Sequence, residues 1–311
     1  MNIKSIQRPV DFLDTEGNYI NAHGGGMLFH EGLYYWYGEC RPEGPSSLNA
    51  QIGISCYSSP DLVTWTNEGV ALPVVDEAGH DLEAGCKIER PKCIYCAATK
   101  KFVLWWHHDL KGIGHLGARA GLALSDSPTG PFEFVTTLRP WEEIAGSMMF
   151  RDCTLFKDDD ETAYLIFATD DNANLAICQL NESYTEIQGP CVRVFEGRYM
   201  EAPCIFKRKG YYYLIASDCT GWLPNEARSA VAKNIFGPWR ELGNPCLGEG
   251  AELTFGAQST YVQAMDGLED GYLFMGDRWK PDALHESEYL WLPLEFRKTV
   301  PYWPERPFMR V

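Results

Sequence analysis

The chain lacks both a long apolar run and an excess of basic residues. No segment reaches the ~18 consecutive apolar residues that span a bilayer, and the N-terminal segment has no apolar stretch of the kind found in signal peptides. The 27 lysines and arginines are outnumbered by 43 acidic residues, which gives a formal net charge of −16. No basic stripe is available to neutralise phosphates, so neither nucleic acid nor a membrane is an expected partner. We expect a cytoplasmic protein.

The eleven cysteines show no arrangement typical of a disulfide framework or a zinc site. Disulfides are disfavoured in a reducing cytosol. Cys93 and Cys96 form a single CxxC, but residues three apart on a strand face opposite sides, and no second CxxC follows. Cys93, Cys153 and Cys204 each lie near the start of an expected strand, where small apolar residues pack well. We expect structural thiols and no disulfide framework.

Helical periodicity is also missing, and a repeat of short strands takes its place. Five times, a polar residue opens a run of apolar residues, and a short turn then leads into a second strand rich in aromatics. Repeats of roughly 50 to 65 residues built from short strands are typical of a β-propeller. The sequence therefore predicts an all-β fold, a single five-bladed β-propeller over residues 1–311, with four strands in each blade. The N-terminal residues or the segment after Leu294 would close the ring. The five opening residues are His23, Glu89, Asp152, Glu201 and Gln258.

These opening residues should converge, because the innermost strands of a propeller line one central channel. Acidic groups that share a small cavity cannot all ionise freely, so the pKa of at least one should rise. A carboxyl that is protonated at neutral pH is what a general acid requires. Glycoside hydrolysis combines such an acid with a second group that acts on water or on the anomeric carbon. Glu89, Asp152 and Glu201 are therefore candidate catalytic residues rather than purely structural ones.

Further polar residues come directly after the second strands, where they would form a rim that hydrogen-bonds sugar hydroxyls. They include Glu39, Asn172, Thr220, Trp222, Asp277 and Arg278, together with His107-His108-Asp109. Adjacent residues on a strand diverge and zinc-ligand spacing is absent, so no metal is expected. His23-Gly-Gly-Gly is too short for a phosphate loop and precedes no helix, so no nucleotide cofactor is expected either. The expected partner is a neutral oligosaccharide or polysaccharide. The sequence gives no indication of the oligomeric state.

Several motifs together resemble glycoside hydrolase family 43, the five-bladed propeller enzymes of plant-glycan breakdown, and within it the exo-β-1,3-galactanase-like branch. The resemblance covers nearly the whole chain. It rests on Asn21-Ala-His-Gly-Gly-Gly, Tyr34-Tyr-Trp-Tyr-Gly-Glu39, Glu89-Arg-Pro-Lys, Arg151-Asp-Cys-Thr-Leu-Phe, Glu201-Ala-Pro and Thr254-Phe-Gly-Ala-Gln-Ser-Thr.

The resemblance implies roles for the opening residues. Glu201 would be the general acid, and Asp152 would orient it and tune its pKa. Most family members open the first blade with an Asp that serves as general base, whereas this chain has His23. In the galactanase-like branch the role of acting on the water maps to Gln258. A neutral amide is a very poor base, so Glu89 and His23 stay open as alternatives.

The resemblance further implies an inverting, exo-acting hydrolase that releases galactose from β-1,3-galactan or its oligosaccharides. The sugar would be held by His23, Glu39, Asn172, Thr220, Trp222 and Arg278. An α-L-arabinofuranosidase or a β-D-galactofuranosidase of the same fold is the alternative within this class. A non-catalytic glycan-binding propeller is the alternative outside it, because the first-blade Asp is missing. A protein-interaction propeller is a weaker hypothesis.

Overall fold

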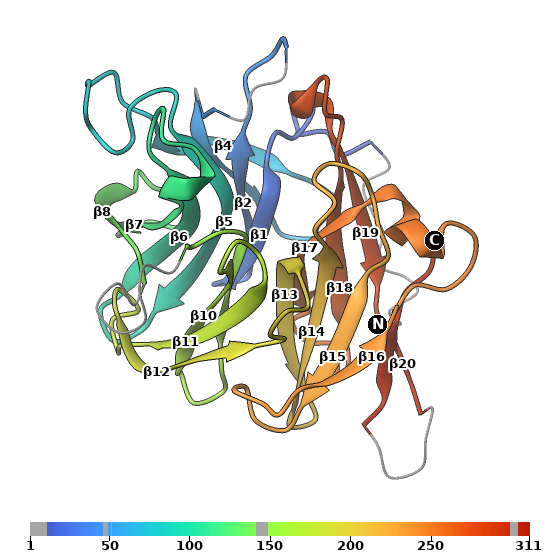
Figure 1. The fold of residues 1–311 in the computed structure, drawn as a ribbon. Helices are drawn as coiled ribbons and strands as arrows, with labels where there is room; N and C mark the ends of the chain where they lie inside the picture. Colours follow the sequence, from blue (N-terminus) through green and yellow to red (C-terminus); the bar gives the residue numbers. More distant parts are fainter. Residues whose placement is uncertain (1–10, 46–48, 51, 141–148, 299–303) are drawn as a thin grey trace.

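The structure is a computed structural model that describes residues 11–45, 49–50, 52–140, 149–298 and 304–311. Within these residues the elements are almost entirely strands, with three short 3-10 segments at His115–Gly117, Ala251–Gly256 and Leu284–Glu286. Five antiparallel sheets are arranged around a central axis, so that the first and last sheets in the sequence lie next to each other (Figure 1). The predicted all-β, five-bladed propeller is confirmed. Among the described residues, no helix has the length and apolarity needed to cross a bilayer.

The first four sheets have four strands each, in sequence order from the axis outward. Blade 1 contains β1 (His23–His30), β2 (Leu33–Cys40), β3 (Gly53–Ser59) and β4 (Thr66–Pro73). Blade 2 contains β5 (Lys87–Cys96), β6 (Lys101–Asp109), β7 (Arg119–Ser125) and β8 (Glu133–Leu138). Blade 3 contains β9 (Cys153–Lys157), β10 (Ala163–Thr169), β11 (Asn174–Leu180) and β12 (Ile187–Val194). Blade 4 contains β13 (Met200–Arg208), β14 (Tyr211–Asp218), β15 (Arg228–Ala232) and β16 (Arg240–Gly243).

The fifth blade differs from the prediction, because its sheet has three strands in the described part of the chain. They are β17 (Gln258–Ala264), β18 (Tyr272–Arg278) and β19 (Glu288–Pro293); a separate pair follows, β20 (Glu295–Arg297) and β21 (Arg306–Phe308). Phe12 closes the ring by packing, since its ring lies 5.0 Å from Trp291 in blade 5 and 6.2 Å from Trp36 in blade 1. Met309, near the C-terminus, instead forms a β-bridge with Cys246, after blade 4.

Both faces of the second strands are buried, because each blade packs against a neighbour on either side. In β6, Val103 and Trp105 belong to the core shared with blade 3, whereas Leu104 and Trp106 belong to the core shared with blade 1. This alternation is the period of two that a strand imposes. It also separates Cys93 from Cys96, which lie in different cores, as the sequence predicted.

Trp105 provides a test of this packing. Its side chain is 0% exposed, and its indole N–H donates to the Tyr184 carbonyl at 2.9 Å. Trp105→Ala should lower the free energy of unfolding by about 3–5 kcal/mol, because it leaves a cavity and an unpaired carbonyl. Denaturation in guanidinium chloride measures this loss. Leu116→Ala, at a side chain that is 75% exposed, is the control and should change stability by less than about 0.5 kcal/mol. Similar losses in the two variants would contradict the packing described.

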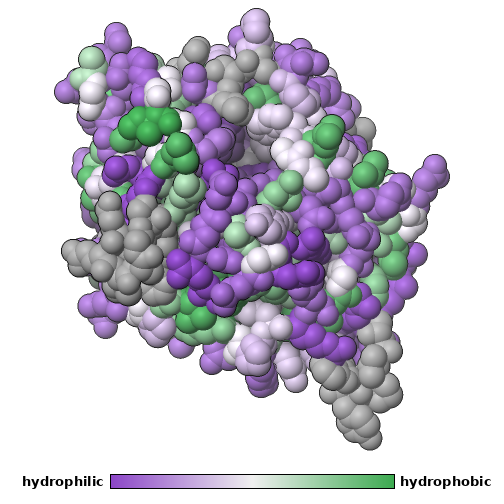
Figure 2. Space-filling view, viewed as in Figure 1, coloured by the Kyte–Doolittle hydropathy of each residue, from purple (hydrophilic) through white to green (hydrophobic). Residues whose placement is uncertain are grey.

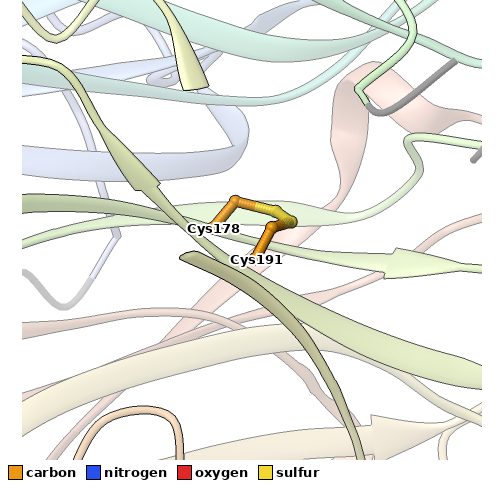
Figure 3. The surroundings of a disulfide bond; sticks show 2 residues. All are labelled: Cys178 and Cys191. Atoms are coloured by element: carbon orange, nitrogen blue, oxygen red, sulfur yellow. A yellow bond between two sulfur atoms is a disulfide. The ribbon is translucent and has the colours of Figure 1, made fainter. Parts of the chain in front are cut away.

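One pair of cysteines corrects the expectation of thiols throughout. Cys178 on β11 and Cys191 on β12 are direct cross-strand partners, with Cα atoms 3.9 Å apart, and they form a disulfide (Figure 3). The sequence could not reveal this pair, because it depends on the register between two outer strands. The other nine cysteines are free.

A recurring β-bulge shapes the inner strands. The register shifts directly after the opening residue in blades 1, 2 and 4. The bulged residues Gly24, Arg90 and Ala202 have left-handed φ values of 58°, 55° and 52°. Such a conformation costs free energy for a residue with a Cβ atom, and bulges of this kind often re-aim side chains next to active sites.

Candidate active site

Residues from all five blades line one cavity of about 180 Å³ at the end of the channel where the inner strands begin. Seven of the predicted site residues meet there: Glu39, Glu89, Asp152, Asn172, Glu201, Trp222 and Gln258. They come from distant parts of the sequence, and the repeat is what predicted their convergence. The face shown in Figure 2 is mostly hydrophilic, with apolar residues in small separate patches.

Glu201 is held by two side-chain amides. Its Oε1 accepts a hydrogen bond from Gln258 Nε2, and its Oε2 accepts one from Asn172 Nδ2, both at 3.0 Å. Burial, followed by the negative charge of Asp152, raises the pKa of Glu201 to about 7, although Arg90 opposes the shift. Glu201 is therefore a carboxyl group that holds a proton near neutral pH, as a general acid must.

Asp152 is anchored from two neighbouring blades. Its Oδ2 accepts a hydrogen bond from the Ala202 N–H at 3.1 Å and lies 3.2 Å from Arg90 Nη2. The Ala202 donor belongs to the bulge that directly follows Glu201. Asp152 is thus fixed relative to Glu201 through the main chain.

Gln258 uses its whole hydrogen-bonding capacity. Its Oε1 accepts from Arg90 Nη2 at 2.5 Å and from Trp279 Nε1 at 2.9 Å. Its Nε2 donates to Glu201 and to Ser217 Oγ, both at 3.0 Å. Because guanidinium and indole nitrogens only donate, they determine which way the amide faces. The amide NH₂ group therefore points toward Glu201.

Glu89 differs from Glu201, because its surroundings lower its pKa instead of raising it. Burial opposes its ionisation, but the neighbouring His107 more than offsets this and lowers the pKa of Glu89 to about 2. Glu89 Oε2 lies 3.0 Å from His107 Nδ1. Its other carboxylate oxygen has no hydrogen-bond donor among the residues that the structure describes. Glu89 thus carries a negative charge into the cavity at neutral pH.

Glu39 completes the acidic lining. Its Oε1 accepts the Arg90 N–H at 2.9 Å, and Oε2 pairs with the buried guanidinium of Arg41. Burial raises the pKa of Glu39, and Arg41 opposes this. Glu39, like Asp152, is held by the N–H of a bulged residue on the next blade.

Three predicted site residues do not line this cavity, which corrects their placement. His23 is 0% exposed and stacks on Tyr289 at 5.2 Å, and burial lowers its pKa to about 3. Thr220 is exposed, and its hydroxyl donates to the Leu223 carbonyl. Arg278 donates to the Phe255 carbonyl and lines a different cavity. In each case the position beside a strand end was predicted, but the direction of the side chain was not.

The sequence reasoning missed two residues that organise the cavity. Arg90 is 5% exposed and contacts Asp152, Gln258 and the Ser259 carbonyl. It directly follows Glu89, and only the bulge makes both side chains face inward. Trp279 follows Arg278, and its ring lies 5.0 Å from Trp222. A strand alternation counted from Asp277 would have found it, since residues two apart share a face.

One group in the described chain has the spacing of a metal site. Ligand atoms of Glu89, His107 and His115 lie within 4.8 Å of one another. His107 Nδ1 lies 3.0 Å from Glu89 Oε2, and His107 Nε2 lies 3.1 Å from Asp109 Oδ1, so these side chains also fit an ion-paired cluster that needs no metal.

The fold and the cavity define a class of protein. A carboxyl group with a raised pKa beside a second carboxyl group, in a cavity rich in hydrogen-bonding groups and lined by aromatic rings, is the arrangement of a glycoside hydrolase. Residues 27–274 match the model of glycosyl hydrolases family 43. The chain belongs to this family.

Solved structures extend the comparison over nearly the whole chain. A family-43 β-1,3-galactosidase solved with galactodeoxynojirimycin is 43% identical, with a TM-score of 0.91 and 96% of each chain covered. An exo-β-1,3-galactanase from Clostridium thermocellum is 38% identical, with a TM-score of 0.86 over 97% of this chain and 64% of that one. A curated β-D-galactofuranosidase from Aspergillus niger is 24% identical over 69% of this chain. The chain spans 58% of the length of that curated relative.

Proposed function

We propose that this protein is an inverting, exo-acting glycoside hydrolase that releases galactose from β-1,3-galactan or its oligosaccharides. The observation that carries the mechanism is the raised pKa of Glu201 beside Asp152 and Gln258. The similarity to a β-1,3-galactosidase over 96% of both chains supports the substrate. A cavity of about 180 Å³ is smaller than the ~300–1,000 Å³ of sites for drug-sized ligands. It suits one sugar ring, which supports attack at a chain end.

In this proposal Glu201 donates its proton to the leaving oxygen, and Asp152 keeps that proton in place by its charge. Glu39, Asn172 and Trp222 hold the sugar. The water attacks the anomeric carbon from the opposite face and gives its proton to a base.

Glu89 is the best candidate for that base. Glu89 lines the cavity, and one of its carboxylate oxygens has no hydrogen-bond donor among the described residues, whereas His23 is buried and does not line the cavity. Gln258 already uses both lone pairs and both N–H groups in hydrogen bonds. We therefore assign Gln258 the role of positioning Glu201. Glu89 has a low pKa, so it is a weak base that stays ionised throughout the working range.

The pH dependence tests the role of Glu201. A general acid works only while it is protonated, and the pKa of Glu201 is raised to about 7. Turnover should therefore stay level below about pH 7 and fall roughly tenfold per pH unit above it. Initial rates between pH 4 and 10, at saturating substrate, would measure this basic limb. A limb near the ordinary glutamate pKa of ~4.3 would contradict the assignment.

A substrate panel tests the sugar. We expect galactose release from linear β-1,3-galactooligosaccharides, one residue at a time, with inverted anomeric configuration visible by NMR. The similarity to a β-D-galactofuranosidase supports a second candidate, so galactofuranosyl and arabinofuranosyl substrates belong in the same panel. Release of a furanose alone would retain the mechanism and replace the substrate.

A further inference from the structure

A row of charged side chains leads from Glu89 away from the cavity, and none of them beyond Glu89 has a role in the proposed mechanism. His107 Nδ1 lies 3.0 Å from Glu89 Oε2, and His107 Nε2 lies 3.1 Å from Asp109 Oδ1. The side chains of His107 and Asp109 are each 1% exposed. The imidazole is therefore clamped between two carboxylates and shielded from water.

The row continues to the surface. Asp109 Oδ2 lies 3.0 Å from His115 Nδ1 and 3.5 Å from Lys87 Nζ. Lys87 Nζ in turn lies 3.3 Å from His115 Nε2. The His115 side chain is 43% exposed at the cavity rim. Carboxylate oxygens thus alternate with side-chain nitrogens from the cavity to the surface.

The register of blade 2 builds this arrangement. Glu89 on β5 pairs with His107 on β6, and Lys87 pairs with Asp109. Because alternate residues share one face of a strand, His107 and Asp109 project together. His108 projects to the opposite face, where its Nδ1 accepts the Trp106 indole N–H at 3.2 Å.

The charges reinforce one another. Burial alone would lower the pKa of His107, but the two carboxylates raise it to about 10. The resulting imidazolium stabilises the Glu89 carboxylate. Arg41 and His115 also favour that carboxylate, whereas Glu39 is the acidic group that faces it from blade 1.

We propose that His107 and Asp109 are positioning residues for Glu89: the imidazolium fixes one carboxylate oxygen of Glu89, so that the other points at the attacking water. Asp109 holds the imidazolium in its turn. The three residues resemble a catalytic triad in their order. Here, however, Asp109 stabilises a charged His107, and His107 orients the Glu89 carboxylate, which is the base. This inference rests on the proposed function, because Glu89 matters for catalysis only if a glycosidic bond is cleaved.

Asp109→Asn tests the proposal while keeping the shape of the side chain. Without the Asp109 charge, His107 loses its proton more easily, and the pKa of Glu89 rises. The acidic limb of kcat/KM should therefore move to higher pH, and kcat should fall roughly ten- to hundredfold, part of the 10²–10⁴ that acid–base groups supply. KM should change little. His108→Gln, a buried histidine on the same strand that does not face Glu89, is the control and should leave the pH profile unchanged even if it lowers Tm. A wild-type profile and kcat in Asp109→Asn would overturn the proposal.

Nitrogen-15 NMR of the histidine rings gives a readout that needs neither a variant nor a substrate. In the wild-type enzyme, the His107 ring should remain doubly protonated at pH 8. A neutral His107 ring at that pH would overturn the proposal even if Asp109→Asn failed to fold. If the wild-type enzyme released no sugar from any substrate, the proposed function would fail, yet the NMR result would still decide the state of His107.

Discussion

Glu201→Gln is expected to remove nearly all turnover and to leave glycan binding almost unchanged. Glutamine keeps the shape and can still contact Asn172 and Gln258, but it has no proton to give to the leaving oxygen. Because a general acid contributes about 10²–10⁴-fold, kcat should fall by at least a hundredfold. Galactose release and calorimetric binding of a β-1,3-galactooligosaccharide would be measured on the same preparations.

The matched control is Glu249→Gln, which makes the same change of charge at an exposed position. It should retain full activity. If Glu201→Gln kept more than about a tenth of wild-type kcat, Glu201 would not be the acid. If both proteins bound glycan and neither turned it over, the chain would be a glycan-binding member of its family.

Glu89→Ala should lower kcat by a similar factor, about 10²–10⁴. Added azide should then restore part of the lost turnover. Removing the carboxylate leaves room beside the anomeric carbon for a small anion. Azide then attacks that carbon while Glu201 protonates the leaving oxygen, so no base is needed. From a β-linked galactoside the product should be α-galactosyl azide, which NMR and mass spectrometry identify.

The same experiment on Gln258→Ala distinguishes the alternatives for the group that acts on water. We expect no galactosyl azide from that variant, because Gln258 faces Glu201 and not the water. Azide rescue of Gln258→Ala but not of Glu89→Ala would exchange the two roles. Rescue of neither would leave Glu89 as a group that only binds the sugar.

The sequence predicts the number of blades and the convergence of the opening residues, because both follow from a repeat that is visible in the order of polar and aromatic residues. Glu89, Asp152, Glu201 and Gln258 were found in this way. The sequence could not predict which neighbours of these residues also face the cavity. Arg90 should point away from the cavity on a regular strand, and it faces inward only because of the bulge at its own position.

Side-chain direction also explains why three of the predicted site residues do not line the cavity. His23 opens its blade as expected, but its ring stacks on Tyr289 and does not line the cavity. Thr220 donates a hydrogen bond to the Leu223 carbonyl, and Arg278 donates one to the Phe255 carbonyl. These outcomes depend on loop conformation and strand register, which a single sequence does not encode in any local pattern. The same holds for the Cys178–Cys191 pair.

The bulges at Gly24, Arg90 and Ala202 place a main-chain donor where one blade meets the next. Their N–H groups bind Asp277, Glu39 and Asp152, each of which belongs to the preceding blade around the ring. The positions of Glu39 and Asp152 in the active centre therefore depend on how neighbouring blades are aligned. A slight rotation of one blade against another would break these contacts while every sheet stayed intact. The proposed catalytic groups are consequently held where neighbouring blades meet rather than within any one blade.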